Sequence, residues 1–210
     1  MKPLIAIHAC HKYSDLRQAV RETWVAKWGH LIDIKFFVGQ PAGDEPDVVY
    51  LDCPDDFWSL GLKNSGSSRY ARAHGYTNLF KCDDDTFVHV PRLLSSGFEQ
   101  WEYTGRRCQA NNFVYAQGGA GYWIGPRLID VMADISDGWW RLKPAMHNQF
   151  EDLGTGIQAH FHKFGLKDDT RYFHATTNTL GYPAPGNNFI TAHKCNRWRH
   201  EHFIELNTNA

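Results

Sequence analysis

Three consecutive carboxylates, Asp83, Asp84 and Asp85, interrupt an otherwise mostly apolar stretch from residue 79 to residue 90. This pattern predicts a buried strand with acids at its end. Carboxylates so close together raise one another's pKa, and a divalent cation bound by their oxygens would relieve the repulsion. A metal site is therefore the first hypothesis. The alternative is an Asp-rich turn in which the side chains bond their own backbone.

The composition narrows the class of protein. The chain has 210 residues, of which 42% are hydrophobic, enough to bury the core of a single domain. A net charge of −1 excludes a general attraction to nucleic acid or anionic membranes. No segment approaches the roughly 20 apolar residues of a membrane helix, and the apolar start is too short for a signal peptide. The five cysteines form no CxxC pair, which indicates reduced thiols. We expect a soluble, cytoplasmic protein.

The elements expected around the aspartates alternate between strand and helix. Strands are predicted at 3–9, 32–38, 48–51 and 79–82. A helix capped by Ser14 follows the first strand, and a helix of roughly 15 residues ends near Gly75. This alternation is typical of an α/β fold. The aspartates then lie at the carboxyl end of the fourth strand, the edge where open α/β sheets bind ligands.

The second half of the chain adds further candidates. Strands at 107–115 and 122–124 flank the glycine-rich segment 118–121, which is either a close approach to a ligand or a hairpin turn. A helix begins at Pro126 and ends near residue 135. Trp139 and Trp140 are expected in a loop, as a sugar platform or a hydrophobic plug. A helix from Glu151 to about residue 164 carries Glu151 and Asp152 in its first turn.

Taken in order, these segments resemble the family of inverting glycosyltransferases that includes the β-1,3-galactosyltransferases, β-1,3-N-acetylglucosaminyltransferases and fringe enzymes. The resemblance extends over nearly the whole chain and rests on several motifs in the family's order. They are RQAVRETW at 17–24, FFVG at 36–39, DDFWSLGLKN at 55–64, KCDDDTFV at 81–88, GGAGY at 118–122, EDLGTG at 151–156 and ITAH at 190–193.

The resemblance implies a GT-A fold, an α/β domain with a mixed, mostly parallel central sheet flanked by helices. It implies one catalytic domain over 1–210, with a nucleotide-binding half at about 1–90 and an acceptor half at about 91–210. The donor would be a UDP-sugar carrying a hexose or N-acetylhexosamine. Mn²⁺ or Mg²⁺ would neutralise the charge that develops on the leaving diphosphate.

The same resemblance distributes roles among the metal-site residues. Asp85 would bind the metal, and His193 would be an additional ligand, with imidazole favouring Mn²⁺. His174 competes with His193 for that place. Asp83 would face the ribose or uracil rather than the metal, and Asp84 would support the motif.

Inversion needs a base that deprotonates the acceptor hydroxyl. Asp152 is the candidate and Glu151 the alternative, while a plain helix cap remains open for both.

The sequence leaves alternatives for the residues expected near the nucleotide-sugar donor. His8, Arg17 and Arg21 would lie near the uracil, although His8 stands where relatives commonly have lysine. Arg17 and Arg21 are equally open to a structural role as partners of acidic residues. Lys63 would meet the diphosphate, or merely begin its helix.

The sequence does not determine which acceptor receives the sugar or in which compartment the protein works. Golgi members of this family carry a membrane anchor and lumenal disulfides, which are not evident here, so a bacterial or viral cytoplasm is expected. The acceptor is a glycan, a protein or a modified nucleobase in phage-type DNA, the last through basic residues at 69–72, 106–107 and 194–199. Two rival classes remain: a metal-dependent phosphohydrolase or nuclease, which usually displays a second set of carboxylates, and a noncatalytic sugar-binding module.

Overall fold

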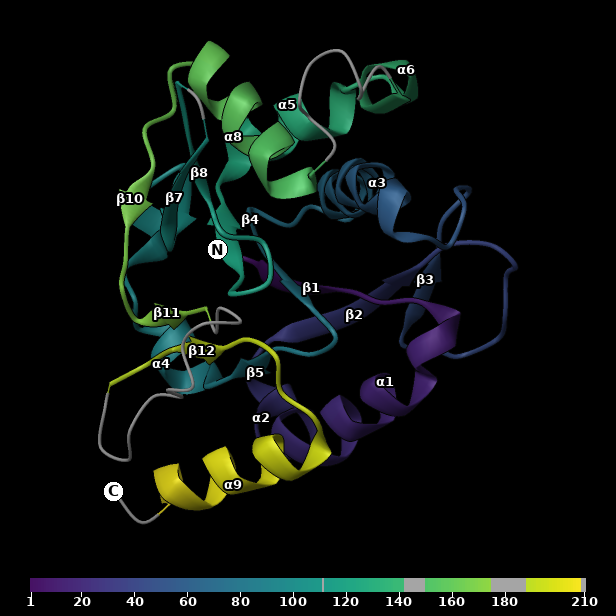
Figure 1. Cartoon of the computed structure of the whole chain (residues 1–210), viewed down its shortest axis with the longest axis vertical. Coiled ribbons are helices and arrows are strands. Elements are labelled where there is room, and N and C mark those ends of the chain that lie inside the picture. The colour runs from purple at the N-terminus through teal and green to yellow at the C-terminus, as the bar shows by residue number, and fades with distance from the viewer. Residues whose placement is uncertain (111, 142–149, 175–187, 209–210) are drawn as a thin grey trace.

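The computed structural model describes residues 1–110, 112–141, 150–174 and 188–208. Its centre is a seven-stranded sheet with the strand order β10-β6-β9-β4-β1-β2-β3 (Figure 1). The strands of this sheet are β1 (Pro3–His8), β2 (Asp33–Val38), β3 (Val48–Tyr50), β4 (Asn78–Asp83), β6 (Tyr103–Gly105), β9 (Tyr122–Ile124) and β10 (Lys167–Asp168).

The central sheet is mixed and mostly parallel, as predicted. β1 pairs in parallel with β2 and β4, β2 with β3, and β10 with β6, whereas β9 runs antiparallel to β4 and β6. In this register His8, the last residue of β1, lies opposite Asp83, the last residue of β4. The carboxyl ends of the two central strands therefore meet at one edge of the sheet, the usual ligand edge of an open α/β fold.

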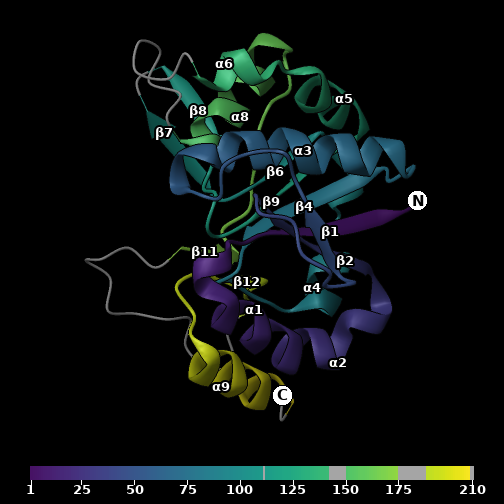
Figure 2. The same ribbon diagram turned by 90° about the vertical axis from the view of Figure 1, so that its right-hand side faces the viewer.

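Helices cover both faces of this sheet (Figure 2). One face carries α1 (Ser14–Val20), α2 (Ala26–Trp28) and α9 (Arg197–Thr208), and the other carries α3 (Leu60–Ala73), α5 (Pro126–Asp134), α6 (Asp137–Arg141) and α8 (Glu151–Phe161). No helix in these ranges is long and apolar enough to cross a membrane.

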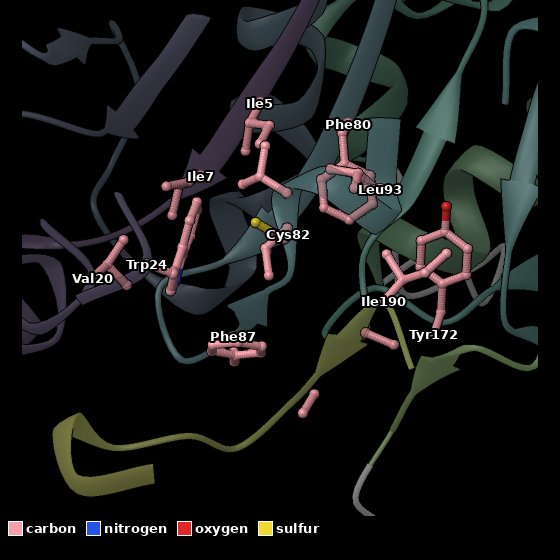
Figure 3. Close-up of a cluster of buried hydrophobic side chains, with 14 of the residues drawn as sticks. Ile5, Ile7, Val20, Trp24, Phe80, Cys82, Phe87, Leu93, Tyr172 and Ile190 are labelled. Carbon is pink, nitrogen blue, oxygen red and sulfur yellow. The ribbon is translucent and has the colours of Figure 1, made fainter. Parts of the chain in front are cut away.

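The alternation of side chains along β1 explains why both faces are covered. Ile5 and Ile7 belong to a core cluster with Trp24 of the π-helix Arg21–Val25 (Figure 3), whereas Leu4 and Ala6 belong to the cluster on the opposite face. All four β1 residues are fully buried. A strand that is apolar on both faces is stable only between two layers of helices, so the sequence of β1 dictates a three-layer architecture.

Two small sheets complete the fold. β5 (Phe87–Val88) pairs antiparallel with β12 (Thr191–Ala192), which pairs in parallel with β11 (Tyr172–Phe173), and α4 (Val90–Leu94) follows β5. β7 (Arg107–Ala110) and β8 (Phe113–Ala116) form an antiparallel pair. The pairing of β5 with β12 brings the chain directly after the aspartates next to the chain directly before His193.

Three local predictions are wrong. The single strand expected at 107–115 is two strands, β7 and β8, because the chain reverses between them. Ser14 does not cap its helix: a 3₁₀ turn at His11–Tyr13 precedes it, and Ser14 is the first residue of α1. Trp139 and Trp140 lie in α6 rather than in a loop. Trp140 is fully buried and donates its indole N–H to Ser65 Oγ at 2.7 Å, which confirms the plug interpretation for this residue.

The other predicted elements are confirmed, with shifts of a few residues at their ends. The helix expected to end near Gly75 is α3, and it is preceded by a 3₁₀ turn at Phe57–Ser59 that Asp56 caps. The glycine-rich segment 118–121 does not close a hairpin, because β8 and β9 belong to different sheets. None of the five cysteines forms a disulfide.

Candidate active site

A cleft of about 690 Å³ opens at the carboxyl ends of β1 and β4. Its walls come from the end of β1 and the turn after it, the loop and 3₁₀ turn before α3, and segment 81–85. Segment 117–119, the start of α8 at 150–152 and residues 193–194 complete the lining. Segments from the whole length of the chain therefore converge where the topology predicts a ligand site.

Three potential metal ligands gather inside this cleft. Ligand atoms of Asp83, Asp85 and His193 all lie within 4.8 Å of one another, and His193 Nε2 is 3.2 Å from Asp85 Oδ1. The backbone fixes this arrangement, because Cys195 N–H donates to the carbonyl of Asp85 at 2.7 Å. Two carboxylates and an imidazole are a donor set that suits Mn²⁺, and Mg²⁺ through the carboxylates, so the residues fit the predicted ion.

His174 lies beside this group but does not join it. Its ring stacks on that of His193 with the centroids 5.0 Å apart. Burial, with a smaller contribution from the neighbouring His193, lowers the pKa of His174 to about 4, so His174 is neutral at neutral pH. This stacking favours a role for His174 in supporting the ring of His193.

A buried lysine ties the metal group to the start of α8. Lys81 Nζ lies 2.7 Å from Asp83 Oδ1 and 2.8 Å from Glu151 Oε1, and the Lys81 side chain is 1% exposed. Burial alone would lower the pKa of Lys81, but the two carboxylates outweigh it and raise the pKa. Lys81 is therefore charged at every physiological pH and holds two acids from distant parts of the sequence in one network.

Lys81 also acts on the acidic residues it contacts. Burial alone would raise the pKa of Asp83, but Lys81 and His193 lower it, so Asp83 is ionised. Burial raises the pKa of Glu151 to about 7 against the opposing effect of Lys81. The Tyr122 hydroxyl donates to Glu151 Oε1 at 3.0 Å. Glu151 Oε1 is thus already bound by two protein groups.

Asp152 is the more accessible of the two acids at this helix start. It is half-buried and lines the cleft, where Gly118 N–H donates to its Oδ2 at 3.0 Å and Leu153 N–H donates to its Oδ1 at 2.8 Å. Burial raises the pKa of Asp152, while the N–H of Gly118 opposes that rise. A carboxylate held by backbone donors, facing a cleft and with a raised pKa can accept a proton from a hydroxyl group.

Asp84 differs from its two neighbours. It is buried, and its Oδ2 has no hydrogen-bond partner among the described residues. Burial raises its pKa to about 8, with Asp83 and Asp85 adding to the rise. Asp84 is therefore protonated at neutral pH in this environment, unlike Asp83.

The glycines at 118 and 119 allow this close approach. A Cβ at Gly118 would collide with the Glu151 carboxylate and crowd Asp152, and one at Gly119 would collide with the ring of His193. Thr86 Oγ1 donates to the Gly119 carbonyl at 2.7 Å, which anchors the segment against the aspartate loop. The glycine-rich segment is thus required by the packing of the site itself.

The predicted donor residues separate into two groups. His8 and Lys63 line the cleft: His8 Nε2 is 3.1 Å from Ser67 Oγ, and Lys63 Nζ binds Asp55 Oδ1 and the carbonyl of Ala9, each at 2.7 Å. Arg17 and Arg21 do not line the cleft.

The two arginines bind acidic residues instead. Arg17 pairs with Glu45 at 2.9 Å, and Arg21 pairs with Glu45 and Asp47 at 2.6 and 2.7 Å. For both we therefore favour the structural role that the sequence left open.

Aromatic side chains crowd one lip of the cleft. Phe57 and Trp58 precede α3, and Phe150 directly precedes Glu151; their exposed fractions are 56%, 58% and 46%. The rings of Phe57 and Phe150 lie 6.3 Å apart, and those of Phe57 and Trp58 lie 5.5 Å apart. We call these three residues the aromatic rim. Large aromatic side chains exposed side by side at a cleft are typical of a binding surface.

Sequence reasoning missed Lys81 and Tyr122 as site residues. The signal for Lys81 was a lysine inside a strand that is otherwise apolar, two residues before Asp83 and therefore on the same face of β4. A buried lysine demands carboxylate partners, and Asp83 was the nearest one. Nothing in the sequence pointed to Glu151 as the second partner, because that contact depends on how α8 packs.

The chain is similar to known proteins in sequence and in fold. No family model matches the sequence. N-acetyllactosaminide β-1,3-N-acetylglucosaminyltransferase 4 of Homo sapiens is 30% identical over 112 residues, 43% of this chain and 29% of that protein. Acetylgalactosaminyl-O-glycosyl-glycoprotein β-1,3-N-acetylglucosaminyltransferase of Mus musculus is 26% identical over 157 residues, 62% of this chain and 40% of that protein. The matches thus cover well under half the length of these relatives.

Solved structures show the fold. A glycosyltransferase involved in the glycosylation of the major capsid of PBCV-1 superposes with a TM-score of 0.56 at 14% identity, covering 97% of this chain and 100% of that one. The galactosyltransferase LgtC, solved with donor and acceptor sugar analogues, superposes with a TM-score of 0.54 at 12% identity, covering 100% and 96%. The solved structures show that this chain has the GT-A fold, and its sequence is similar to those of the β-1,3-N-acetylglucosaminyltransferases.

Proposed function

We propose that this protein is an inverting, metal-dependent glycosyltransferase that moves a hexose or N-acetylhexosamine from a UDP-sugar to a hydroxyl group of a glycan. One observation carries the proposal: the candidate metal ligands Asp83, Asp85 and His193 share a single cleft with Asp152. A site that binds a nucleotide diphosphate at one end and deprotonates a hydroxyl at the other needs these two features together.

Asp83, Asp85 and His193 would hold Mn²⁺, whose charge stabilises the leaving diphosphate. Lys81 supports this role because its Nζ holds the Asp83 carboxylate, with Oδ1 at 2.7 Å. Asp83 is close enough to Asp85 and His193 to act as a ligand itself, in addition to the role toward the nucleoside that the motif implies. His8 and Lys63 line the cleft at the end of β1 and the start of α3, which supports our proposal that they lie beside the donor.

Asp152 is the proposed base. The acceptor oxygen forms a bond to the anomeric carbon of the donor sugar while the bond from that carbon to the diphosphate oxygen breaks. The electron pair of the broken bond stays on the diphosphate, and the hydroxyl proton passes to Asp152. Glu151 is the weaker candidate, since its Oε1 is bound by Lys81 and Tyr122. A single displacement of this kind inverts the anomeric configuration.

The aromatic rim supports a sugar acceptor. Phe57 and Phe150 line the cleft beside Asp152, and aromatic faces suit the apolar C–H face of a pyranose ring. A polyanionic acceptor finds less support, because Arg69 and Arg72 contact Asp137 and Asp134 at 3.0 and 2.7 Å. We therefore propose a glycan and not DNA.

The test is incubation with Mn²⁺ and a panel of UDP-sugars. Slow hydrolysis of one donor to UDP, and transfer to an added glycan acceptor with inversion at the anomeric carbon, would support the proposal. Release of phosphate from simple esters would favour a phosphohydrolase. Binding of a sugar with no turnover in any mixture would favour a noncatalytic module.

A further inference from the structure

Gln117 is a polar residue of the cleft to which the proposed reaction assigns no role. It directly follows β8, is half-buried and lines the cleft. Its own N–H donates to the carbonyl of Arg106 at 2.8 Å. The N–H of Ala116, the residue before it, donates to the Tyr103 hydroxyl at 2.8 Å. The backbone that carries the Gln117 side chain is therefore fixed.

One hydrogen bond determines which way the amide of Gln117 points. Ala120 N–H donates to Gln117 Oε1 at 2.5 Å. Because a backbone N–H can only donate, the amide atom that faces it must be the oxygen, and the nitrogen Nε2 lies on the other side. Among the described residues Nε2 has no hydrogen-bond partner, and it is not one of the buried atoms that lack one. The amide thus presents two accessible N–H donors at the cleft wall.

The bond to Ala120 does not by itself require a glutamine. It supports the turn at 118–121, in which Gly121 N–H donates to the carbonyl of Gly118 at 3.1 Å. A serine or threonine hydroxyl commonly accepts a backbone N–H in such a turn, so the oxygen of Gln117 is sufficient for this purpose. The amide nitrogen takes no part in it. A polar group that packing does not use, at the wall of a cleft, is available to a ligand.

The order of residues 117–119 indicates which ligand Gln117 meets. Gly119 lies against the ring of His193, at the metal end of the cleft. Gly118 N–H donates to Oδ2 of Asp152, the proposed base, at 3.0 Å. Gln117 follows on the side of Gly118 that leads away from His193. The molecule whose hydroxyl meets Asp152 is the acceptor, so the other oxygens of the acceptor are the ligand atoms expected beside Gln117.

We propose that Gln117 determines acceptor specificity by donating a hydrogen bond from Nε2 to the sugar oxygen next to the hydroxyl that reacts. The inference rests on the function proposed above and defines the acceptor further, as a pyranose that carries a hydroxyl group beside the reacting one. The amide is neutral and transfers no proton. It orients the sugar so that the reacting hydroxyl faces Asp152, and a sugar without the neighbouring oxygen loses this bond.

Two substitutions separate the amide from its contribution to the turn. Gln117→Met keeps the length of the side chain and removes both the N–H donors and the bond to Ala120. Gln117→Ser keeps an oxygen that can accept the Ala120 N–H, but its side chain is too short to reach a bound sugar. Gln158→Met is the matched control, because Gln158 is a half-buried glutamine of α8 that does not line the cleft.

The experiment measures kcat/KM for methyl glycosides and for their monodeoxy analogues. The methyl glycosides of galactose, glucose, N-acetylglucosamine and N-acetylgalactosamine are tested first, and the analogues are made for the one that is accepted. In the unaltered chain, removal of one hydroxyl next to the reacting one should lower kcat/KM about two- to tenfold, the range of a neutral hydrogen bond.

Both Gln117 variants should lower kcat/KM for the parent glycoside by a similar factor and should no longer distinguish it from this analogue. Hydrolysis of the donor without acceptor should change less than about twofold, because one neutral hydrogen bond to the acceptor is absent from that reaction. Gln158→Met should behave like the unaltered chain in both assays.

Several results would overturn the inference. One is a discrimination between parent and analogue that persists in both Gln117 variants. Another is an equal loss in Gln158→Met, or a loss of donor hydrolysis as large as the loss of transfer, which would attribute the effect to the turn. Donor hydrolysis without transfer to any of these glycosides would also overturn it. If the unaltered chain neither hydrolyses a UDP-sugar nor transfers one, the function proposed above fails instead, so the two failures are distinguishable.

Discussion

The floor and the lip of the cleft are built in opposite ways. On the floor, Lys81 and Glu151 are buried and joined by an ion pair of 2.8 Å, and Lys81 also holds Asp83. At the lip, Phe150 and Lys194 are exposed and come from turns or helix starts. A floor fixed by buried ion pairs suits a reaction step that must keep its geometry, whereas an exposed lip can change its side chains and select substrates without disturbing the core.

From this difference we expect that substitution of Asp152, which lines the wall of the cleft between floor and lip, has the largest effect on turnover. Asp152→Asn removes the proposed base and keeps the shape of the side chain. We expect kcat for sugar transfer to fall by about 10²- to 10⁴-fold, because general-base catalysis contributes about that much. UDP binding in Mn²⁺, measured by calorimetry, should remain nearly unchanged. Glu151→Gln is the comparison and should retain more turnover. Lost UDP binding with retained turnover in Asp152→Asn would refute the role.

The buried residues of the cleft floor should also contribute to the free energy of unfolding. Lys81→Met leaves the carboxylates of Asp83 and Glu151 without their shared cation, and breaking a buried pair typically costs about 3–5 kcal/mol in the free energy of unfolding. Urea denaturation measures this loss. Lys35→Met is the control, because Lys35 also lies on a strand, and its Nζ donates to the backbone carbonyl of Pro46 at 3.1 Å instead of holding buried carboxylates.

A double variant makes the test of Lys81 specific. Adding Glu151→Gln to Lys81→Met removes one of the stranded acids, so the combined loss should be smaller than the sum of the two separate losses. Strictly additive losses would show that Lys81 and Glu151 do not act as a pair. The floor would then be a set of independent residues and no different from the lip.

Substitutions at the lip should have the smallest effect, and this effect should be confined to the acceptor substrate. Phe150→Ala removes a ring from the aromatic rim and should raise KM for a glycan acceptor about two- to tenfold, since aromatic contacts contribute about 0.5–1.5 kcal/mol. Donor hydrolysis without acceptor should not change. Phe161→Ala is the matched control, because Phe161 is an exposed phenylalanine at the other end of α8. An unchanged acceptor KM in Phe150→Ala would remove the rim from the acceptor site.

The sequence predicted the local elements but not the contacts between distant segments. The order of strands and helices around β1 and β4 followed from apolar patterning, and the position of Asp83, Asp84 and Asp85 at a strand end followed from it directly. Pairing between distant segments did not, because no local pattern encodes which strand β12 will join. The contacts of Lys81 with Glu151 and of Arg17 with Glu45 are likewise products of packing. The sequence indicated that these cations could have acidic partners, but it did not identify Glu151 or Glu45 as those partners.

The central claim is that Asp85 and His193 bind a metal that holds a nucleotide diphosphate in this cleft. Its most direct test is the melting temperature with UDP alone, with Mn²⁺ alone and with both, in the unaltered chain and in Asp85→Ala. We expect a rise with UDP and Mn²⁺ together that exceeds the sum of the separate shifts and disappears in Asp85→Ala, because binding to the folded state stabilises it by mass action. A UDP-dependent rise that needs no Mn²⁺ and survives in Asp85→Ala would contradict it.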